Sequence, residues 1–248
     1  MTPFTAELIG TAFLVLLGDG VVANVLLGRT KGQNAGWMVI TTGWALAVTV
    51  GVYLSNAVSG AHLNPAVSIA QAATGAMTWD TAAIYIAAQM LGAFLGAVLV
   101  WLTYLPHWAE TPDPGAKLAV FCTGPAIRNP ISNLITEAIG TFVLVFGLAF
   151  ILSPANLTVG TGFDKAIQPA LVGVLVWAIG LSLGGPTGYA INPARDLGPR
   201  IAHAILPIPG KVHSDWSYAW IPVVGPIIGG VLGAFLAKAI ATAPAVAA

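Results

Sequence analysis

The chain has 248 residues, of which 57% are hydrophobic and 7% charged, its formal net charge is zero, and its mean hydropathy is +0.86. A soluble domain carries about 25% charged residues, so a chain this poor in charge is expected to be an integral membrane protein. It has no basic stripe, which argues against nucleic acid as a partner. Cys122 is the only cysteine, which excludes an intrachain disulfide and a zinc site, and it is expected to be inert.

Six apolar segments are long enough to cross a bilayer, because a helix needs about 20 mostly apolar residues to do so. In chain order they are residues 5–27, 37–56, 79–104, 132–152, 166–183 and 218–241. An even number of spans places both termini on the same side. Two further segments, 57–77 and 184–204, are too short and too rich in Gly and Pro to span, and they are predicted to be re-entrant.

The two parts of the chain repeat one pattern. Residues 6–18 align with residues 136–147, which places Glu7 opposite Glu137 and matches an Ile-Gly-Thr run in each copy. The offset between the two acids is 130 (137 − 7). This similarity predicts an internal structural repeat.

Each half, about 1–125 and 130–248, then holds three spans and one re-entrant segment. An odd number of spans makes the two halves insert in opposite directions, and this is the inverted repeat of membrane proteins whose broken helices meet at the midplane. We expect one transmembrane domain over residues 1–248.

The tripeptide Asn-Pro-Ala occurs once in each re-entrant segment, 128 positions apart (192 − 64), as Asn64-Pro65-Ala66 and Asn192-Pro193-Ala194. Proline fits the first turn of a helix and asparagine caps it, so short helices are predicted over 65–76 and 193–204. Inverted symmetry brings their positive N-termini together near the membrane centre. Both asparagine amides then direct donors at one point, where the oxygen of a hydroxyl group or of water can accept them.

Both signature segments, SGAHLNPAV and GYAINPARD, resemble those of the major intrinsic protein family, the aquaporins and glycerol facilitators, and the resemblance covers nearly the whole chain. It implies an all-α membrane protein with six transmembrane helices, two re-entrant half-helices and an aquaporin-like right-handed bundle. It also implies a homotetramer in the cell membrane, with one pore in each subunit and cytoplasmic termini. The Lys and Arg residues of the loops contradict that orientation by the positive-inside rule.

The narrowest ring of the family, carried over residue by residue, falls on Trp44, Gly180, Tyr189 and Arg195. Water-selective members resemble one another in having His at the second position, so Gly180 is expected to leave room for a carbon skeleton. Asp196, directly after Arg195, resembles the glycerol-facilitator branch. The glycerol pores of the family usually carry Phe at the third position, and the hydroxyl group of Tyr189 is expected to narrow the ring slightly and make it more polar.

The resemblance therefore implies a passive channel for glycerol, other small uncharged solutes and water that excludes protons and ions, in part through positive half-helix ends and an Arg. Dihydroxyacetone, urea, hydrogen peroxide and small neutral acids fit the same ring. No enzymatic activity, cofactor or metal site is expected. The alternatives are a water-selective aquaporin, against which Gly180 and Asp196 argue, and a secondary transporter, which needs titratable groups that the spans largely lack.

Four polar residues are predicted to support the pore: Glu7, Glu137, His62 and Asp196. The two glutamates are expected to hold the carbonyl groups of each half's loop through hydrogen bonds, in preference to relaying protons. His62 is expected to orient the first loop by hydrogen bonding. Asp19 has no counterpart in the repeat and is expected near the end of the first span, facing water.

Overall fold

The computed structural model describes residues 1–154, 156–157 and 162–242 of the chain, and this part forms ten α-helices. In chain order they are α1 (Pro3–Leu26), α2 (Trp37–Ser59), α3 (Pro65–Ala73), α4 (Trp79–Thr103), α5 (Leu105–Ala109), α6 (Pro114–Phe121), α7 (Pro130–Ile151), α8 (Phe163–Leu183), α9 (Pro193–Ile205) and α10 (Ile221–Thr242). Six of them, α1, α2, α4, α7, α8 and α10, are long and apolar enough to cross a membrane.

The six predicted spans agree with these helices to within three residues at each end. α1 begins earlier than predicted because the Thr2 side chain caps it, accepting a hydrogen bond from the amide of Thr5 at 3.2 Å, with Pro3 in the first turn. The half-helix α3 ends at Ala73 rather than at 76, because Gly75 adopts the left-handed conformation (φ 78°) just after its last turn. α9 extends one residue beyond its predicted end.

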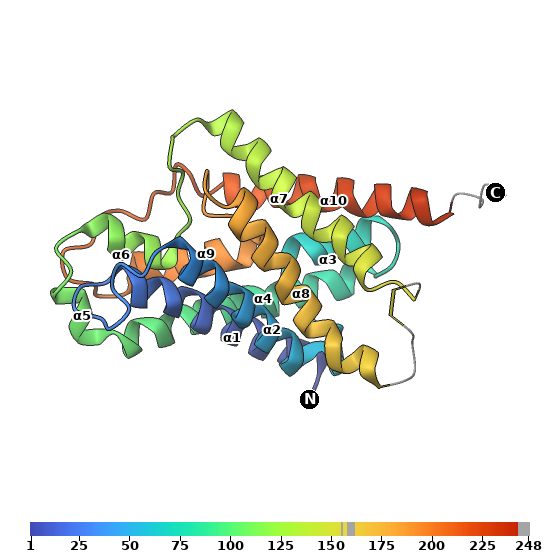
Figure 1. Ribbon diagram of the computed structural model, residues 1–248, viewed down its shortest axis with the longest axis horizontal. Helices are drawn as coiled ribbons and strands as arrows, with labels where there is room; N and C mark the ends of the chain where they lie inside the picture. Colours follow the sequence, from blue (N-terminus) through green and yellow to red (C-terminus); the bar gives the residue numbers. More distant parts are fainter. Residues whose placement is uncertain (155, 158–161, 243–248) are drawn as a thin grey trace.

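The prediction contained no helix between the third and fourth spans, whereas the structure forms α5 and α6 there. Asp113 caps α6 by accepting a hydrogen bond from the amide of Gly115 at 2.8 Å. Trp108 of α5 stacks on Phe121 of α6, with ring centroids 5.4 Å apart. Because α6 packs against α1 and α9, this connection covers one end of the bundle, at the left in Figure 1.

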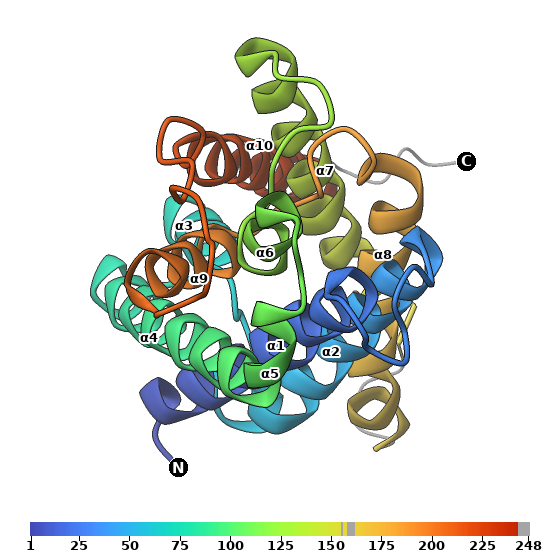
Figure 2. The same cartoon turned by 90° about the vertical axis from the view of Figure 1, so that its left-hand side faces the viewer.

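Helix contacts repeat in the two halves. α1 packs against α2 and α4, and α7 packs in the same way against α8 and α10. The half-helices exchange partners, since α3 packs mainly against α10 of the second half and α9 mainly against α4 of the first half. Figure 2, a view along the longest axis, shows α3 and α9 next to each other between α4 and α10.

Glycines let the α1–α4 and α7–α10 pairs approach closely. A Cβ atom at Gly96 of α4 would lie 2.5 Å from the carbonyl oxygen of Ala12, and one at Gly233 of α10 would lie 2.9 Å from that of Phe142. No side chain fits at either place. Close backbone packing at small residues is how helices associate in lipid, so these contacts hold the scaffold around the half-helices.

Candidate functional site

The N-termini of the two half-helices meet inside the bundle, each capped by its asparagine. The Oδ1 atom of Asn64 accepts a hydrogen bond from the amide of Ala66 at 2.9 Å, and that of Asn192 accepts from Ala194 at 3.0 Å. Each Nδ2 donates across the repeat, Asn64 to the carbonyl of Ile191 and Asn192 to that of Leu63, both at 2.8 Å. An amide NH₂ group has two hydrogens, so each asparagine keeps one donor for a solute.

Both loops that lead into the half-helices hold non-glycine residues in the left-handed conformation. The φ angles are 52° at Ala61 and 50° at Leu63, and 38° at Tyr189 and 43° at Ile191. These pairs are 128 positions apart (189 − 61 and 191 − 63), the same offset as the asparagines. Such conformations persist only where the surroundings enforce them, so each loop needs a fixed anchor.

Two buried glutamates supply those anchors. Glu7 accepts hydrogen bonds from the amides of His62 at 2.9 Å and Leu63 at 2.7 Å. Glu137 accepts from the amides of Ala190 at 3.0 Å and Ile191 at 2.8 Å. The expectation that the glutamates hold loop carbonyl groups is wrong: an ionised carboxylate has only acceptors, so it binds the N–H groups.

Arg195 and Trp44 form a stacked pair on the wall of the cavity. The guanidinium carbon of Arg195 lies 3.9 Å from the centroid of the Trp44 ring, within the range of a cation–π contact. Arg195 is placed by the first turn of α9, where its amide also contacts Oδ1 of Asn192 at 3.3 Å. The pair therefore offers fixed hydrogen-bond donors beside an apolar aromatic face.

Tyr189 covers Gly180, which does not itself line the cavity. A Cβ atom at Gly180 would lie 2.8 Å from Cζ and 3.0 Å from Oη of Tyr189. The sequence predicted that the absence of a side chain at Gly180 leaves open space for a solute. In the structure the Tyr189 ring fills that space. Trp37 completes this corner, with its indole N–H 3.1 Å from the Gly180 carbonyl and its ring edge-on to Tyr189 at 5.7 Å.

A continuous cavity of about 870 Å³ connects these groups. Of the predicted site residues it is lined by Trp44, His62, Asn64, Tyr189, Asn192 and Arg195. Aliphatic side chains also line it, including Val48, Val52, Leu144, Leu148, Val172 and Val176. At the other end the cavity reaches Gln71, Thr74 and Lys238, near the ends of α3 and α10. The cavity therefore presents both polar groups and aliphatic side chains to its interior.

Asp196 does not face the cavity; it anchors α9. Its carboxylate accepts hydrogen bonds from the amide (2.8 Å) and hydroxyl (2.6 Å) of Thr123 and from Arg200, whose Nε lies 2.8 Å away. Both side chains of this ion pair are fully buried. Arg200 also donates to the carbonyls of Ser214 and Asp215, which ties α9 to the loop before α10. Arg200 was not predicted as a functional residue, although its i+4 spacing from Asp196 is the signal of a helical ion pair.

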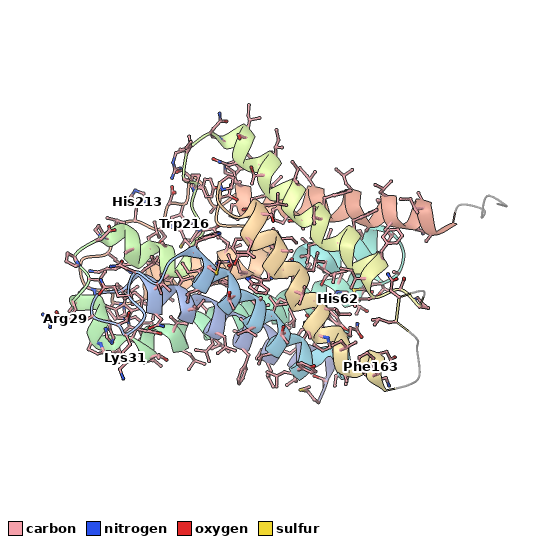
Figure 3. The ribbon with its side chains drawn as sticks, viewed as in Figure 1. Arg29, Lys31, His62, Phe163, His213 and Trp216 are labelled. Carbon is pink, nitrogen blue, oxygen red and sulfur yellow. The ribbon has the colours of Figure 1, made fainter. Side chains whose placement is uncertain are left out.

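His62 lies on the cavity wall, within the bundle in Figure 3. Its Nδ1 atom is 3.0 Å from the hydroxyl of Ser68 in α3, and its ring packs edge-on against Tyr85. Gln89 of α4 donates both to Glu7, at 2.7 Å, and to Ser68, at 3.1 Å. The first loop is therefore tied to α1, α3 and α4 through one polar cluster.

The expectation that Asp19 faces water is wrong. Asp19 lies inside α1 with no exposed surface, and its Oδ1 atom is 3.6 Å from Nη1 of Arg195. The sequence offered no signal for this contact, because the two residues are far apart in the chain and neither has a counterpart in the repeat.

Cys122 is also buried, and burial raises the pKa of its thiol well above the usual value. Within the described ranges, no group of three or more His, Cys, Asp or Glu side chains is arranged to hold a metal ion.

Comparisons with known proteins agree with this architecture. The family model described as "Major intrinsic protein" matches residues 1–237. The "Probable glycerol uptake facilitator protein" of Thermotoga maritima is 62% identical over 228 residues, covering 91% of this chain and 93% of the relative. The "Glycerol uptake facilitator protein" of Bacillus subtilis is 54% identical over 226 residues, covering 91% and 80%. The X-ray structure of the aquaglyceroporin from Plasmodium falciparum superposes with a TM-score of 0.83 at 31% identity, over 96% of this chain and 95% of that one.

The fold and the paired half-helices define a multi-pass membrane protein of aquaporin architecture, as the sequence predicted. The family model and the relatives identify it as a channel and not an enzyme. The chain belongs to the major intrinsic protein family.

Proposed function

We propose that this chain is a passive channel for glycerol and other small uncharged solutes, together with water, and that it excludes protons and ions. The observation that carries the proposal is the Arg195–Trp44 stack beside the Tyr189 ring on the cavity wall. A polyol has hydroxyl groups along one edge and CH groups along the other. It therefore matches donors and aromatic carbon at the same time, and the names of the relatives point to the same solute.

The ring of Trp44, Gly180, Tyr189 and Arg195 is proposed to select the solute. Gly180 acts indirectly in this proposal, because it makes room for the Tyr189 ring against α8. The hydroxyl of Tyr189 is buried and, in the described part of the chain, without a hydrogen-bond partner, so it is available to a passing solute. Dihydroxyacetone, urea, hydrogen peroxide and small neutral acids share the needed features of small size and neutral polarity.

The two Asn-Pro-Ala segments are proposed to orient the solute at the centre. Asn64 and Asn192 each retain one amide hydrogen, and both half-helices direct their positive ends to this point. An oxygen atom that accepts both donors can itself donate only away from the centre. Such an arrangement interrupts a proton wire, and the positive field repels cations.

We propose a homotetramer in the plasma membrane with cytoplasmic termini, built from repeats of about 1–125 and 130–248 in one domain. The end that carries α5 and α6, where Arg29 and Lys31 lie in Figure 3, would then face outward. Most cations at this end bind protein acceptors: Arg29 pairs with Glu110 at 3.0 Å, and Lys211 donates to three carbonyls of the α9 C-terminus, with the longest bond 2.8 Å. These contacts explain why Arg29 and Lys211 lie in these loops without reference to the orientation of the chain in the membrane.

Stopped-flow light scattering of proteoliposomes under a glycerol gradient tests the proposal. Vesicles with the protein should swell with glycerol many times faster than protein-free vesicles, with flux proportional to the gradient. Fast water flux without glycerol flux would instead identify a water-selective channel. Saturable flux with counterflow of labelled glycerol would identify a transporter.

A further inference from the structure

Asp19 and Arg195 are charged residues that each lack a charged counterpart in the other half of the repeat, and the structure brings them together. Arg195 corresponds to Val67 in the first half (195 − 128), and Asp19 corresponds to Ala149 in the second half (19 + 130). The positive residue is thus unique to one half and the negative residue to the other. Their side chains meet at 3.6 Å, between Nη1 of Arg195 and Oδ1 of Asp19.

Asp19 is an acidic residue buried within the transmembrane helix α1, where a charge is energetically costly. It is fully buried, and within the described part of the chain neither carboxylate oxygen accepts a hydrogen bond. A buried charge in a membrane protein is costly unless a partner neutralises it, and it is seldom retained without a role. Arg195 is the only residue that forms an ion pair with it among the described residues.

The same turn of α1 contacts both members of the stacked pair. A Cβ atom at Gly18 would lie 2.5 Å from Cη2 of the Trp44 ring, so the glycine lets that ring rest against α1. The neighbouring Asp19 faces the guanidinium that lies on Trp44. Arg195 is therefore confined by an aromatic face and by a carboxylate that α1 supplies.

We infer that Asp19 is a positioning residue for solute selection: its carboxylate holds the Arg195 guanidinium against Trp44, with the remaining N–H groups directed to the cavity. The inference rests on the proposed function. A guanidinium has five N–H donors in a rigid fork, so the orientation of the fork decides which donors a solute can reach. Glycerol, with several hydroxyl groups, depends on that orientation more than water does.

The test is a double-mutant cycle between Asp19→Asn, which keeps the shape and removes the charge, and Arg195→Val. Glycerol and water permeabilities of proteoliposomes are measured for the wild type, both single variants and the double variant. We expect Asp19→Asn to lower the ratio of glycerol to water permeability roughly three- to tenfold. This is the scale of weakening one hydrogen bond between the charged Arg195 and a glycerol hydroxyl group. In the Arg195→Val background the same change should have no further effect.

Thr11→Val is the matched control. Thr11 lies on the same helix, is fully buried, and has no hydrogen-bond partner for its hydroxyl in the described ranges. Its replacement should leave the ratio unchanged, which excludes a general effect of removing a buried polar group from α1. Asp19→Glu, which keeps the charge, should restore part of the ratio.

An unchanged ratio in Asp19→Asn, or an equal drop in both backgrounds, would overturn the inference. If the wild type conducts no glycerol, the proposed function fails separately, and the thermal midpoints of the same four proteins in detergent still measure the coupling. Additive midpoints then overturn the inference. A double variant more stable than Arg195→Val alone supports it, because the unpaired buried acid has been removed.

Discussion

The two half-helices share one backbone design and differ in what they carry. α3 has nine residues and no charged side chain, whereas α9 has thirteen and carries Arg195, Asp196, Arg200 and His203. Both have an asparagine cap, a strained loop before it and a glutamate that anchors the loop. The comparison teaches that the symmetric elements form the centre of the cavity, whereas Arg195, which we propose to act in solute selection, has no charged counterpart in α3.

A lysine binds the C-terminal end of each half-helix. Lys238 of α10 donates a hydrogen bond, at 2.7 Å, to the carbonyl of Thr74 at the end of α3. Lys211 donates to the carbonyls of His203, Ala204 and Leu206 at 2.6–2.8 Å at the end of α9. A cation at a helix C-terminus opposes the negative end of the helix dipole. Each lysine therefore stabilises the C-terminal end of one half-helix.

The largest expected effect comes from removing the anchor that only α9 has. Arg200→Met leaves Asp196 buried without its cation, which should cost about 3–5 kcal/mol of stability. The residue of α3 equivalent to Asp196 is Ser68 (196 − 128), and Ser68→Ala should cost about 1 kcal/mol. Denaturation by SDS in mixed micelles, followed by circular dichroism, measures both. Arg29→Met, at an exposed arginine, is the control; equal losses in α3 and α9 would contradict the asymmetry.

Gly180→His tests the residues that we propose to select the solute. The new Cβ atom would lie 2.8 Å from Tyr189, so the ring must move into the cavity. We expect glycerol permeability to fall roughly tenfold while water permeability is largely kept, because the opening narrows for the larger solute. Gly185→His, at a glycine with no atom within 4 Å of its added Cβ, is the matched control in the same stopped-flow assay. An unchanged glycerol permeability would show that Gly180 has no part in solute selection.

Replacing each asparagine cap tests whether the two half-helices are equally stabilised at their N-termini. Asn192 accepts from two amides, those of Ala194 and Arg195, and Asn64 accepts from that of Ala66 alone. Loss of a cap costs about 1 kcal/mol, so Asn64→Ala and Asn192→Ala should lower stability by similar amounts, with Asn192→Ala slightly worse. Thermal midpoints in detergent measure the difference. A fall in the thermal midpoint several times larger for one variant than for the other would show that the two caps contribute unequally to stability.

The smallest expected effect is that of Tyr189→Phe. Removing a hydroxyl from the cavity wall should raise the glycerol-to-water ratio about twofold, because the wall becomes less polar and slightly wider. Tyr218 is the matched control, since its hydroxyl is likewise buried and unpartnered in the described residues but does not line the cavity. If Tyr189→Phe and Tyr218→Phe both leave the ratio unchanged, the Tyr189 hydroxyl takes no part in selection.

Much of this fold could be predicted because the physical signals are local. Long apolar runs define the spans, and Asn-Pro marks the start of each half-helix through the geometry of one turn. The six spans and both half-helices follow from such signals, and the comparisons confirm the fold. The helices α5 and α6 were missed because their stability comes from packing of Trp108 on Phe121, which is a tertiary contact.

The polar contacts were harder to predict because they join distant parts of the chain. Asp19 was expected to face water, since nothing near it in the sequence indicates a partner 176 positions away (195 − 19). Gly180 was expected to leave open space, and only the structure reveals that Tyr189 fills it. The glutamates were assigned to the correct loops from the repeat, but to carbonyls rather than to amides.

The exchange of hydrogen bonds between Asn64 and Ile191, and between Asn192 and Leu63, has a consequence for assembly. Each half-helix cap is completed by a carbonyl of the other half, and α3 packs against α10, the last helix among the described residues. Polar groups left unpaired in hydrocarbon cost several kcal/mol, so the first half is unfinished until the second half is in the membrane. The first re-entrant loop is therefore expected to complete its hydrogen bonds only after the second half has entered the membrane.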